Sequence, residues 1–260
     1  MKMNKTNFHT HHNLCRHAVG NVEDYVLEAI KQGYSEIGLS DHGPIPVKIF
    51  TRMSEEEFEQ IYLKEIDEAI LKYKDKIKIH KGLEVEFIYE RVNWYKELLT
   101  KVDYLILGCH FYTGDETINE CSSYKIDTKE KLESYTRLVE EGLKTGLFKI
   151  LAHPDLFMIG YLTFDSFAEE CSRRIIKSAI ENDVIIELNA NGFRKGKRLI
   201  DGKMQYAYPN DEFFKIVKEM NPKVIISSDC HKPELLDDEW MDKAKEFGKV
   251  KKLNIVTSIH

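Results

Sequence analysis

Runs rich in Val, Ile and Leu alternate along the chain with longer segments in which apolar residues recur at helical spacing. This alternation predicts strands and helices arranged around a mainly parallel sheet. Seven such units are present, so we expect an α/β fold of seven strand–helix units. The strands are expected near residues 6–11, 36–41, 78–87, 103–110, 148–153, 184–190 and 223–229.

The helix expected between the second and third strands has the clearest start signal. Ser54 is followed three residues later by Glu57, which is the pattern of a capping box. Apolar residues then keep helical spacing along Phe58, Ile61, Ile66, Ile70 and Tyr73. Other helices are expected near residues 22–32, 91–100, 129–144, 165–182, 210–220 and 234–247, with Gly248 as the C-terminal cap of the last.

Length and composition narrow the class of protein. The chain has 260 residues, 42% of them hydrophobic, which is enough to bury one sizeable core. Neither Pro/Gly/Ser-rich linkers nor low-complexity tracts interrupt the series, so residues 1–260 are expected to form one domain. Lys and Arg number 38 against 44 Asp and Glu, and the resulting net charge of −6 disfavours binding to long polynucleotides.

No run of apolar residues approaches the roughly 20 needed to span a bilayer. Residues 1–5 lead into the first histidine motif without the apolar run of a signal peptide. We therefore expect a cytoplasmic protein without a membrane or nucleic-acid partner, and the sequence leaves its oligomeric state open. The five cysteines are odd in number and lack Cys-x-x-Cys spacing, which argues against disulfides and a thiolate zinc site: Cys15, Cys109, Cys121, Cys171 and Cys230.

Histidines gather where the expected strands end. Seven of the ten lie in short apolar segments that run into loops, and with Glu84 and Asp229 they make nine potential metal ligands. In parallel α/β barrels the reactive residues lie at the carboxyl ends of the strands, so a barrel would bring these scattered residues together. The histidines are His9, His11, His17, His42, His110, His153 and His231.

Side chains alternate faces along an extended segment, which pairs His9 with His11 and turns His12 the other way. The same spacing pairs Asp229 with His231. It also turns Cys109 and Cys230, which directly precede histidines, away from the site, so these cysteines are expected to be packing residues.

Glu84 and Glu86 share a face of the third strand, and Glu84 is expected nearer the barrel interior. Whether Glu86 or His12 takes part is left open. Seven imidazoles and two carboxylates are too many for one zinc ion with about four ligands, so two or three ions are implied. Mixed nitrogen and oxygen ligands suit zinc, iron or manganese without separating them.

These residues resemble the polymerase and histidinol phosphatase (PHP) family, and most closely its histidinol-phosphate phosphatase branch. The resemblance covers nearly the whole chain. Its motifs, in the family's order, are His9–Gly20, Ser40–Pro46, Gly82–Glu86, Gly108–Phe111, Ala152–Asp155, Glu187–Asn189 and Ser228–His231.

The resemblance implies a distorted seven-unit β/α barrel with a trinuclear metal site at the carboxyl ends of its strands. It also implies a metal-dependent phosphomonoesterase of histidine biosynthesis that converts L-histidinol phosphate and water to L-histidinol and phosphate. The first ion would be held by His9, His11, Glu84 and Asp229, the second by Glu84, His110 and His153 with Glu84 bridging, and the third by His17, His42 and His231.

Glu84 and Asp229 are therefore expected to be catalytic. Two ions that share a carboxylate can also share a hydroxide whose pKa they lower to near neutrality, which gives a nucleophile at physiological pH. The third ion can bind a phosphate oxygen, and all three offset the charge that develops on the phosphoryl group.

The substrate phosphate needs further partners, and Arg194 in the stretch Asn189–Gly196 offers a planar fork for it and is expected to act in catalysis. His42 is also expected to contact the substrate, and Arg52 and Lys48, in the loop after His42, are weaker candidates for substrate binding. One departure from the branch concerns the leaving group. Its members commonly carry a basic residue shortly after the fifth-strand histidine, and residues 155–161 here contain none.

Three alternatives remain beside a histidinol-phosphate phosphatase. A phosphoesterase of the same fold could act on another small phosphorylated metabolite or a cyclic phosphodiester; the net charge disfavours a short oligonucleotide. The chain could instead be an inactive metal-binding regulator, although all nine ligand positions are filled. Metal-assisted amide hydrolysis would use hydroxide similarly, but it would need neither a third ion nor an arginine directed at an anion.

Overall fold

The computed structural model describes residues 5–45, 52–115 and 118–259. A seven-stranded parallel sheet runs in the order β1-β2-β3-β4-β5-β6-β9, which confirms the expected α/β barrel class. All seven expected strands form, and most end earlier than predicted because the histidine-bearing segments leave the sheet. The strands are β1 (Thr6–Asn7), β2 (Glu36–Leu39), β3 (Lys78–Val85), β4 (Tyr104–Leu107), β5 (Ile150–Leu151), β6 (Ile185–Asn189) and β9 (Val224–Ser227).

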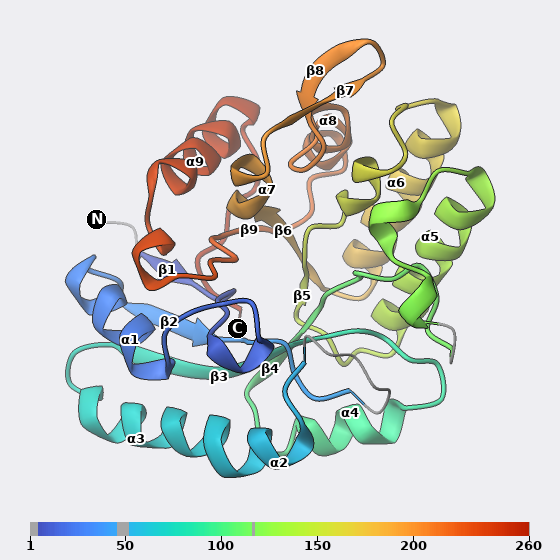
Figure 1. Cartoon of the computed structure of the whole chain (residues 1–260). Helices are drawn as coiled ribbons and strands as arrows, with labels where there is room; N and C mark the ends of the chain where they lie inside the picture. The colour runs from blue at the N-terminus through green and yellow to red at the C-terminus, as the bar shows by residue number, and fades with distance from the viewer. Residues whose placement is uncertain (1–4, 46–51, 116–117, 260) are drawn as a thin grey trace.

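The first and last strands meet beyond their ends. Thr10 forms a parallel bridge with Cys230, and the His11 amide donates to the Cys230 carbonyl at 3.0 Å. At the amino ends of these two strands, the Val224 amide donates to the Asn254 carbonyl, and the Thr6 hydroxyl donates to the Thr257 carbonyl. The C-terminal segment therefore fills the gap between β1 and β9, and the barrel is nearly closed (Figure 1).

Amphipathic helices surround the sheet (Figure 1), and no helix in the described ranges is long and apolar enough to cross a membrane. Most of the expected helices form within one or two residues of the predicted bounds. They are α1 (Val22–Lys31), α2 (Glu55–Glu57), α3 (Leu63–Tyr73), α4 (Val92–Leu98), α5 (Lys129–Lys144), α6 (Ser166–Glu181), α7 (Ala190–Arg194), α8 (Asp211–Met220) and α9 (Glu239–Lys251).

The capping box at Ser54 is confirmed: its hydroxyl accepts from the Glu57 amide, and the Glu57 carboxylate accepts from the Ser54 amide. The expected continuous helix is instead divided by a π-helical turn over Phe58–Tyr62. The wider turn shifts the buried face, so Ile61 is exposed and Tyr62 is buried. The Tyr62 hydroxyl lies 2.8 Å from the carbonyls of Leu39 and Gly82, which ties the helix to two strands.

The prediction that Gly248 caps the last helix was wrong. α9 begins later, after the N-cap Asp238, and continues through Gly248 to Lys251. Lys252, at a φ of 53°, adopts the left-handed conformation that ends it. A side chain at 248 would approach Ile255 at 3.3 Å, so the glycine allows the helix to pack closely against the segment that follows it.

A two-stranded antiparallel hairpin, β7 (Lys197–Ile200) and β8 (Lys203–Tyr206), was not expected from the pattern of apolar residues. It projects from the rim of the molecule (Figure 1), and its strands are largely exposed, so they lack the alternation of a half-buried strand. Asp201 and Gly202 at its turn both have positive φ, 48° and 72°. The Asp-Gly dipeptide was the signal that could have predicted it.

The bottom of the barrel interior is filled around Tyr104, whose hydroxyl donates to the Phe8 carbonyl at 2.7 Å. Two glycines on neighbouring strands make room for this ring. A Cβ atom would lie 2.0 Å from the Tyr104 hydroxyl oxygen at Gly38 and 2.3 Å from the ring at Gly82. The floor beneath the strand ends therefore depends on these two positions.

We expect Gly82→Ala to destabilise the protein, because the added methyl group would lie 2.3 Å from the ring of Tyr104, which is fully buried. Overpacking of this kind typically costs about 1–3 kcal/mol of unfolding free energy. Urea unfolding measures the effect. Gly248→Ala is the control, because residue 248 lies inside a helix and its added methyl group meets only the flexible ends of side chains. Equal stability of Gly82→Ala and the wild type would contradict this account of the barrel floor.

Candidate metal centre

A cavity of about 550 Å³ opens at the carboxyl ends of the strands. Seven of the nine expected ligands line it, and the other two, His9 and Glu84, are buried beneath it. The structure therefore brings all nine residues into one cluster. The seven are His11, His17, His42, His110, His153, Asp229 and His231.

Glu84, at the end of β3, lies at the middle of this cluster. Its Oε2 atom is 2.9 Å from His42 Nδ1 and 3.5 Å from Nε2 of both His9 and His11. The two imidazoles that follow β1 are themselves close, with their Nε2 atoms 3.0 Å apart. One carboxylate oxygen thus faces the imidazoles supplied by β1 and β2.

The other oxygen faces a second group. Glu84 Oε1 is 3.2 Å from His153 Nε2 and 3.8 Å from His110 Nε2, and these imidazoles follow β5 and β4. Because the two oxygens of one carboxylate face separate groups of nitrogen donors, Glu84 has the geometry of a bridging ligand.

Asp229 lies beside the first group, with Oδ1 3.2 Å from His11 Nε2 and 3.7 Å from His231 Nδ1. Strand alternation, which paired Asp229 with His231, is not the reason for their proximity. β9 ends at Ser227, and Asp229 has a φ of 47°. A turn rather than an extended strand therefore brings the two side chains together.

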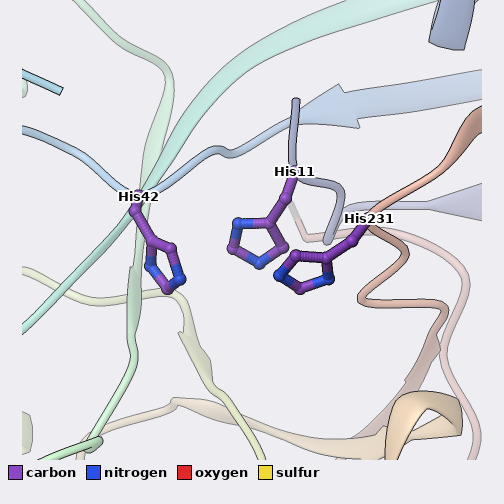
Figure 2. A group of neighbouring side chains, drawn as sticks. All are labelled: His11, His42 and His231. Carbon is purple, nitrogen blue, oxygen red and sulfur yellow. The ribbon is translucent and has the colours of Figure 1, made fainter. Parts of the chain in front are cut away.

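His11, His42 and His231 converge from three different segments (Figure 2). The His11 ring lies 4.3 Å from that of His42 and 4.4 Å from that of His231, and His17 lies 4.8 Å from His231. The group therefore joins His11, which the resemblance assigns to the first ion, with the three histidines assigned to the third. His11 lies between the two sets.

Three buried carboxylates that were not assigned a role from the sequence contact the Nδ1 atoms of the histidines and orient the rings. Glu187 Oε1 lies 2.7 Å from His9 Nδ1, Asp41 Oδ1 lies 3.2 Å from His11 Nδ1, and Glu86 Oε1 lies 2.8 Å from His110 Nδ1. Such partners fix the ring orientation of metal-binding histidines and raise their basicity. The signal in the sequence was an acid inside an apolar run, as in Ile185–Asn189, because a buried carboxylate needs a partner.

The cluster is strongly acidic for a buried site. Of the described residues, six carboxylates are buried here and around it, against a single buried arginine, Arg52, and no buried lysine. Buried charge of one sign is costly unless cations compensate it. Cations, either protons on the histidines or bound metal ions, are therefore the complement that this site requires. The carboxylates are Asp41, Glu84, Glu86, Asp155, Glu187 and Asp229.

The carboxylates change the pKa values of the histidines nearest to them. Burial lowers the pKa of His9, but Glu187, Glu84 and Asp229 together raise it well above its ordinary value. Burial also lowers the pKa of His11, but hydrogen bonds to Asp229 and Asp41 bring it to about 9. The same negative field that favours protons on these rings favours divalent cations.

The histidines on the other side of the cluster have lowered pKa values. Burial, followed by the charge of His11, lowers the pKa of His231 to about 3. Burial lowers the pKa of His42 well below its ordinary value, and it also lowers that of His17. These rings are neutral at physiological pH and have lone pairs for a metal ion.

Unpartnered atoms test whether metal ions fit the cluster. Among the described residues, Glu84 Oε2, Asp229 Oδ1, His42 Nδ1 and His153 Nδ1 are buried without a well-formed hydrogen bond, although Glu84 Oε2 lies 2.9 Å from His42 Nδ1 and Asp229 Oδ1 lies 3.2 Å from His11 Nε2. Buried polar atoms are rarely left without a partner, and these belong to residues that surround one space. The atoms are nitrogen and oxygen donors of the kind that zinc, iron and manganese accept, so the residues fit divalent ions.

Three cysteines and His12, which neighbour the cavity-lining histidines in the sequence, do not line the cavity. Cys109 and Cys230 are buried in the hydrophobic core, as expected. Burial raises the pKa of the Cys15 thiol, which donates to the His12 carbonyl, so it remains a thiol rather than a thiolate ligand. The His12 ring packs on Tyr62 with 4.9 Å between the ring centroids, facing away from the cavity.

Arg194 lies elsewhere than expected. The stretch after β6 forms the short helix α7. Asn191 on this helix and Lys195, its C-cap four residues later, lie on the face that lines the cavity. Arg194 is turned about 100° from Lys195 by the helical rotation. Its guanidinium contacts Asp238 and the loop after β9, so Lys195 occupies the position at the cavity wall that was expected for Arg194.

Arg52 lines the cavity and is buried, and its Nη2 atom donates to Glu86 at 2.7 Å. Glu86 therefore joins Arg52 to His110, which links a cavity cation to a histidine of the cluster. Lys48, the other weaker candidate for substrate binding, lies outside the described residues.

Comparisons with known proteins show the family of this chain. The family model described as the PHP domain matches residues 7–191. A probable histidinol-phosphatase from Deinococcus radiodurans is 24% identical over 250 residues, covering 93% of this chain and 92% of the relative. A histidinol-phosphatase from Bacillus subtilis is 23% identical over 262 residues, covering 88% of this chain and 94% of the relative.

Solved structures show the same fold. The histidinol phosphate phosphatase from Lactococcus lactis, complexed with zinc, L-histidinol and phosphate, has a TM-score of 0.73 at 18% identity. The match covers 97% of this chain and 95% of the Lactococcus lactis chain. A putative histidinol phosphatase from Listeria monocytogenes has a TM-score of 0.70 at 19% identity, covering 92% of this chain and 99% of its own.

Proposed function

We propose a function for this chain from one premise, that it belongs to the PHP domain family. It is a metal-dependent phosphomonoesterase that hydrolyses L-histidinol phosphate to L-histidinol and phosphate, a step of histidine biosynthesis. The observation that carries the proposal is the position of Glu84, whose two oxygens face separate groups of histidines at the floor of an open cavity. Curated relatives that span more than four fifths of the chain are named histidinol-phosphatases, which supports the choice of substrate.

We assign three divalent ions, zinc, iron or manganese, to the cluster. The separation of the Glu84 oxygens supports one ion on the side of His9 and His11 and a second on the side of His110 and His153. Asp229 completes the first set. The neutral rings of His17, His42 and His231 support the third.

When bound, the ions supply a nucleophile at neutral pH and offset the charge on the phosphoryl group. Glu84 would offer one carboxylate oxygen to each of two ions. Glu187, Asp41 and Glu86 hold the histidine rings in place, so that little reorganisation is needed when the substrate binds. Burial raises the pKa of Tyr208 well above its ordinary value, so this phenol at the cavity wall keeps its proton and can donate to the substrate.

The cavity size suits a small phosphorylated metabolite, and its outer wall carries Arg52 and Lys195 as cations for the phosphate. His42 also lies at this wall, where it would meet a phosphate through its ion. We assign the whole of residues 1–260 to one domain, because the C-terminal segment contributes to closing the barrel. A cytoplasmic location stays a prediction.

One observation favours a second candidate, a phosphatase of the same kind with another leaving group. The segment after His153, where the branch commonly carries a basic residue, forms a short 3-10 helix over Leu156–Ile159 with buried apolar side chains. This segment therefore does not supply the basic residue. Phosphate release from L-histidinol phosphate beside a panel of other phosphomonoesters and cyclic phosphodiesters, with the metal content measured, separates the two. No release from any ester by metal-replete protein would refute both.

We expect Lys195→Ala to lower kcat/KM for the phosphate ester roughly 10- to 150-fold, the equivalent of about 1.5–3 kcal/mol for a lost charge-assisted hydrogen bond. The metal content should not change, because the ammonium group is not a ligand. Steady-state kinetics measure the effect. Lys203→Ala is the matched control, since it removes an exposed lysine from β8 outside the cavity lining. Equal kinetics of Lys195→Ala and Lys203→Ala would show that Lys195 does not bind the phosphate.

A further inference from the structure

The guanidinium of Arg194 makes five hydrogen bonds to protein groups. Nε and Nη2 donate to the two carboxylate oxygens of Asp238 at 2.8 and 2.9 Å, in a bidentate pair. Nη1 donates to the Ser228 carbonyl at 2.6 Å, and Nη2 lies 2.9 Å from the Leu235 carbonyl and 3.1 Å from the Ser228 hydroxyl. The side chain is 11% exposed, so these bonds are largely protected from water.

These contacts hold both ends of one loop. Ser228 and Leu235 enclose the segment that carries Asp229 and His231, and the Ser228 hydroxyl also donates to the Leu235 carbonyl at 2.8 Å. Asp238, the N-cap of α9, follows directly after this segment. Arg194 therefore joins the loop after β9 to the start of the next helix.

The loop needs such support because Asp229 is in an unfavourable backbone conformation. Its φ of 47° lies in the left-handed region, which non-glycine residues occupy only where the surrounding structure holds them. The carbonyl that Arg194 binds belongs to the residue directly before it. The guanidinium thus acts at the peptide whose orientation decides where the Asp229 carboxylate points.

The same short segment also holds the Asp229 side chain. The amide groups of Asn189 and Asn191 donate to Asp229 Oδ2 at 3.0 and 3.3 Å. They leave Oδ1 directed at the imidazoles of His11 and His231. α7 and its N-cap therefore fix this carboxylate at its side chain, and Arg194 fixes it at the backbone.

We propose that Arg194 is a positioning residue, which sets the affinity of the metal centre by holding the loop 228–235 with its ligands Asp229 and His231. The inference rests on the proposed function only in taking these two residues as metal ligands. It replaces the expected contact between Arg194 and the substrate phosphate.

Zinc affinity of the purified full chain tests the proposal, measured by competition with a chromophoric chelator. Arg194→Ala should lower the affinity for Zn²⁺ about 10- to 100-fold, the usual effect of removing an outer partner of a metal ligand. At saturating Zn²⁺ the variant should regain turnover with an unchanged KM. Arg194→Lys should recover part of the affinity, because one ammonium cannot bind both Asp238 oxygens and the Ser228 carbonyl at once.

The matched control is Arg173→Ala, which removes an arginine from a bidentate pair with Glu219 on the surface of α6. It should bind Zn²⁺ as the wild type does. Asp238→Asn gives an independent test, since asparagine caps a helix as well as aspartate but lacks the charge that orients Arg194. We expect a smaller loss of zinc affinity in the same direction.

Wild-type zinc affinity in Arg194→Ala, together with a KM that stays raised at every zinc concentration, would overturn the proposal and restore the phosphate contact. Should Arg194→Ala fail to fold, Arg194→Lys and Asp238→Asn decide: wild-type zinc affinity in both refutes the positioning role, and a loss in both supports it. If the wild type hydrolyses no ester, the proposed function fails, yet the zinc comparison still decides the role of Arg194.

Discussion

Replacing Glu84 by glutamine should remove metal ions and turnover together. The side chain keeps its shape, but it loses the charge that two groups of histidines share, and its amide nitrogen cannot act as a ligand. We expect a fall of kcat/KM on the order of 10³-fold or more, which corresponds to about 4 kcal/mol of transition-state stabilisation supplied by the ions. Metal analysis by mass spectrometry should show fewer bound ions per chain than in the wild type.

The matched control is Glu86→Gln, two residues along the same strand face. Glu86 contacts His110 from behind and pairs with Arg52, so its loss should weaken activity less and leave more of the metal in place. If Glu84→Gln retained the full metal content and normal turnover, the bridge would have to be Glu86 or no carboxylate at all.

Removal of the metal ions by a chelator should lower the stability of the whole chain as well as its activity. Five of the buried carboxylates contact residues of the cluster, and without cations their repulsion is offset mainly by protonated histidines and Arg52. An ion present at 1,000 times its Kd contributes about 4 kcal/mol to the stability of the native state, so its loss is a large fraction of the total. Urea unfolding before and after chelation, then after Zn²⁺ is restored, measures the effect.

Glu84→Gln provides the control for this experiment too. A variant that already holds fewer ions should lose less stability on chelation than the wild type does. An unchanged unfolding midpoint in chelated wild-type protein, with the absence of metal verified, would show that the carboxylates are compensated within the protein and would remove the electrostatic argument for the ions.

Much of the fold could be predicted because its signals are local. The spacing of apolar residues gave the seven strands and most helices, and Ser54 with Glu57 marked a helix start that the structure confirms. The elements that were missed had weak local signals or depended on distant contacts. The hairpin β7–β8 lacks a buried face, and α9 continues through Gly248 and ends at Lys252, whose left-handed conformation is not marked by a glycine.

The candidate site divides in the same way. The position of the histidines at strand ends was visible in the sequence, because parallel strands direct their carboxyl ends to one face of a barrel. The outer carboxylates Glu187 and Asp41 were not assigned, since their partners His9 and His11 lie far away along the chain. Only the pairing of strands brings these groups within hydrogen-bond distance.

The sequence by itself determined that the histidine-bearing segments reach the carboxyl face of the barrel, since each of them follows a strand of a parallel sheet. Only the tertiary structure decided how these side chains are oriented beyond the strand ends. There the backbone follows turns and short helices, such as the left-handed Asp229 and the helix that turns Arg194 from the cavity and Lys195 toward it. These conformations are stabilised by hydrogen bonds to distant segments, which no local periodicity encodes.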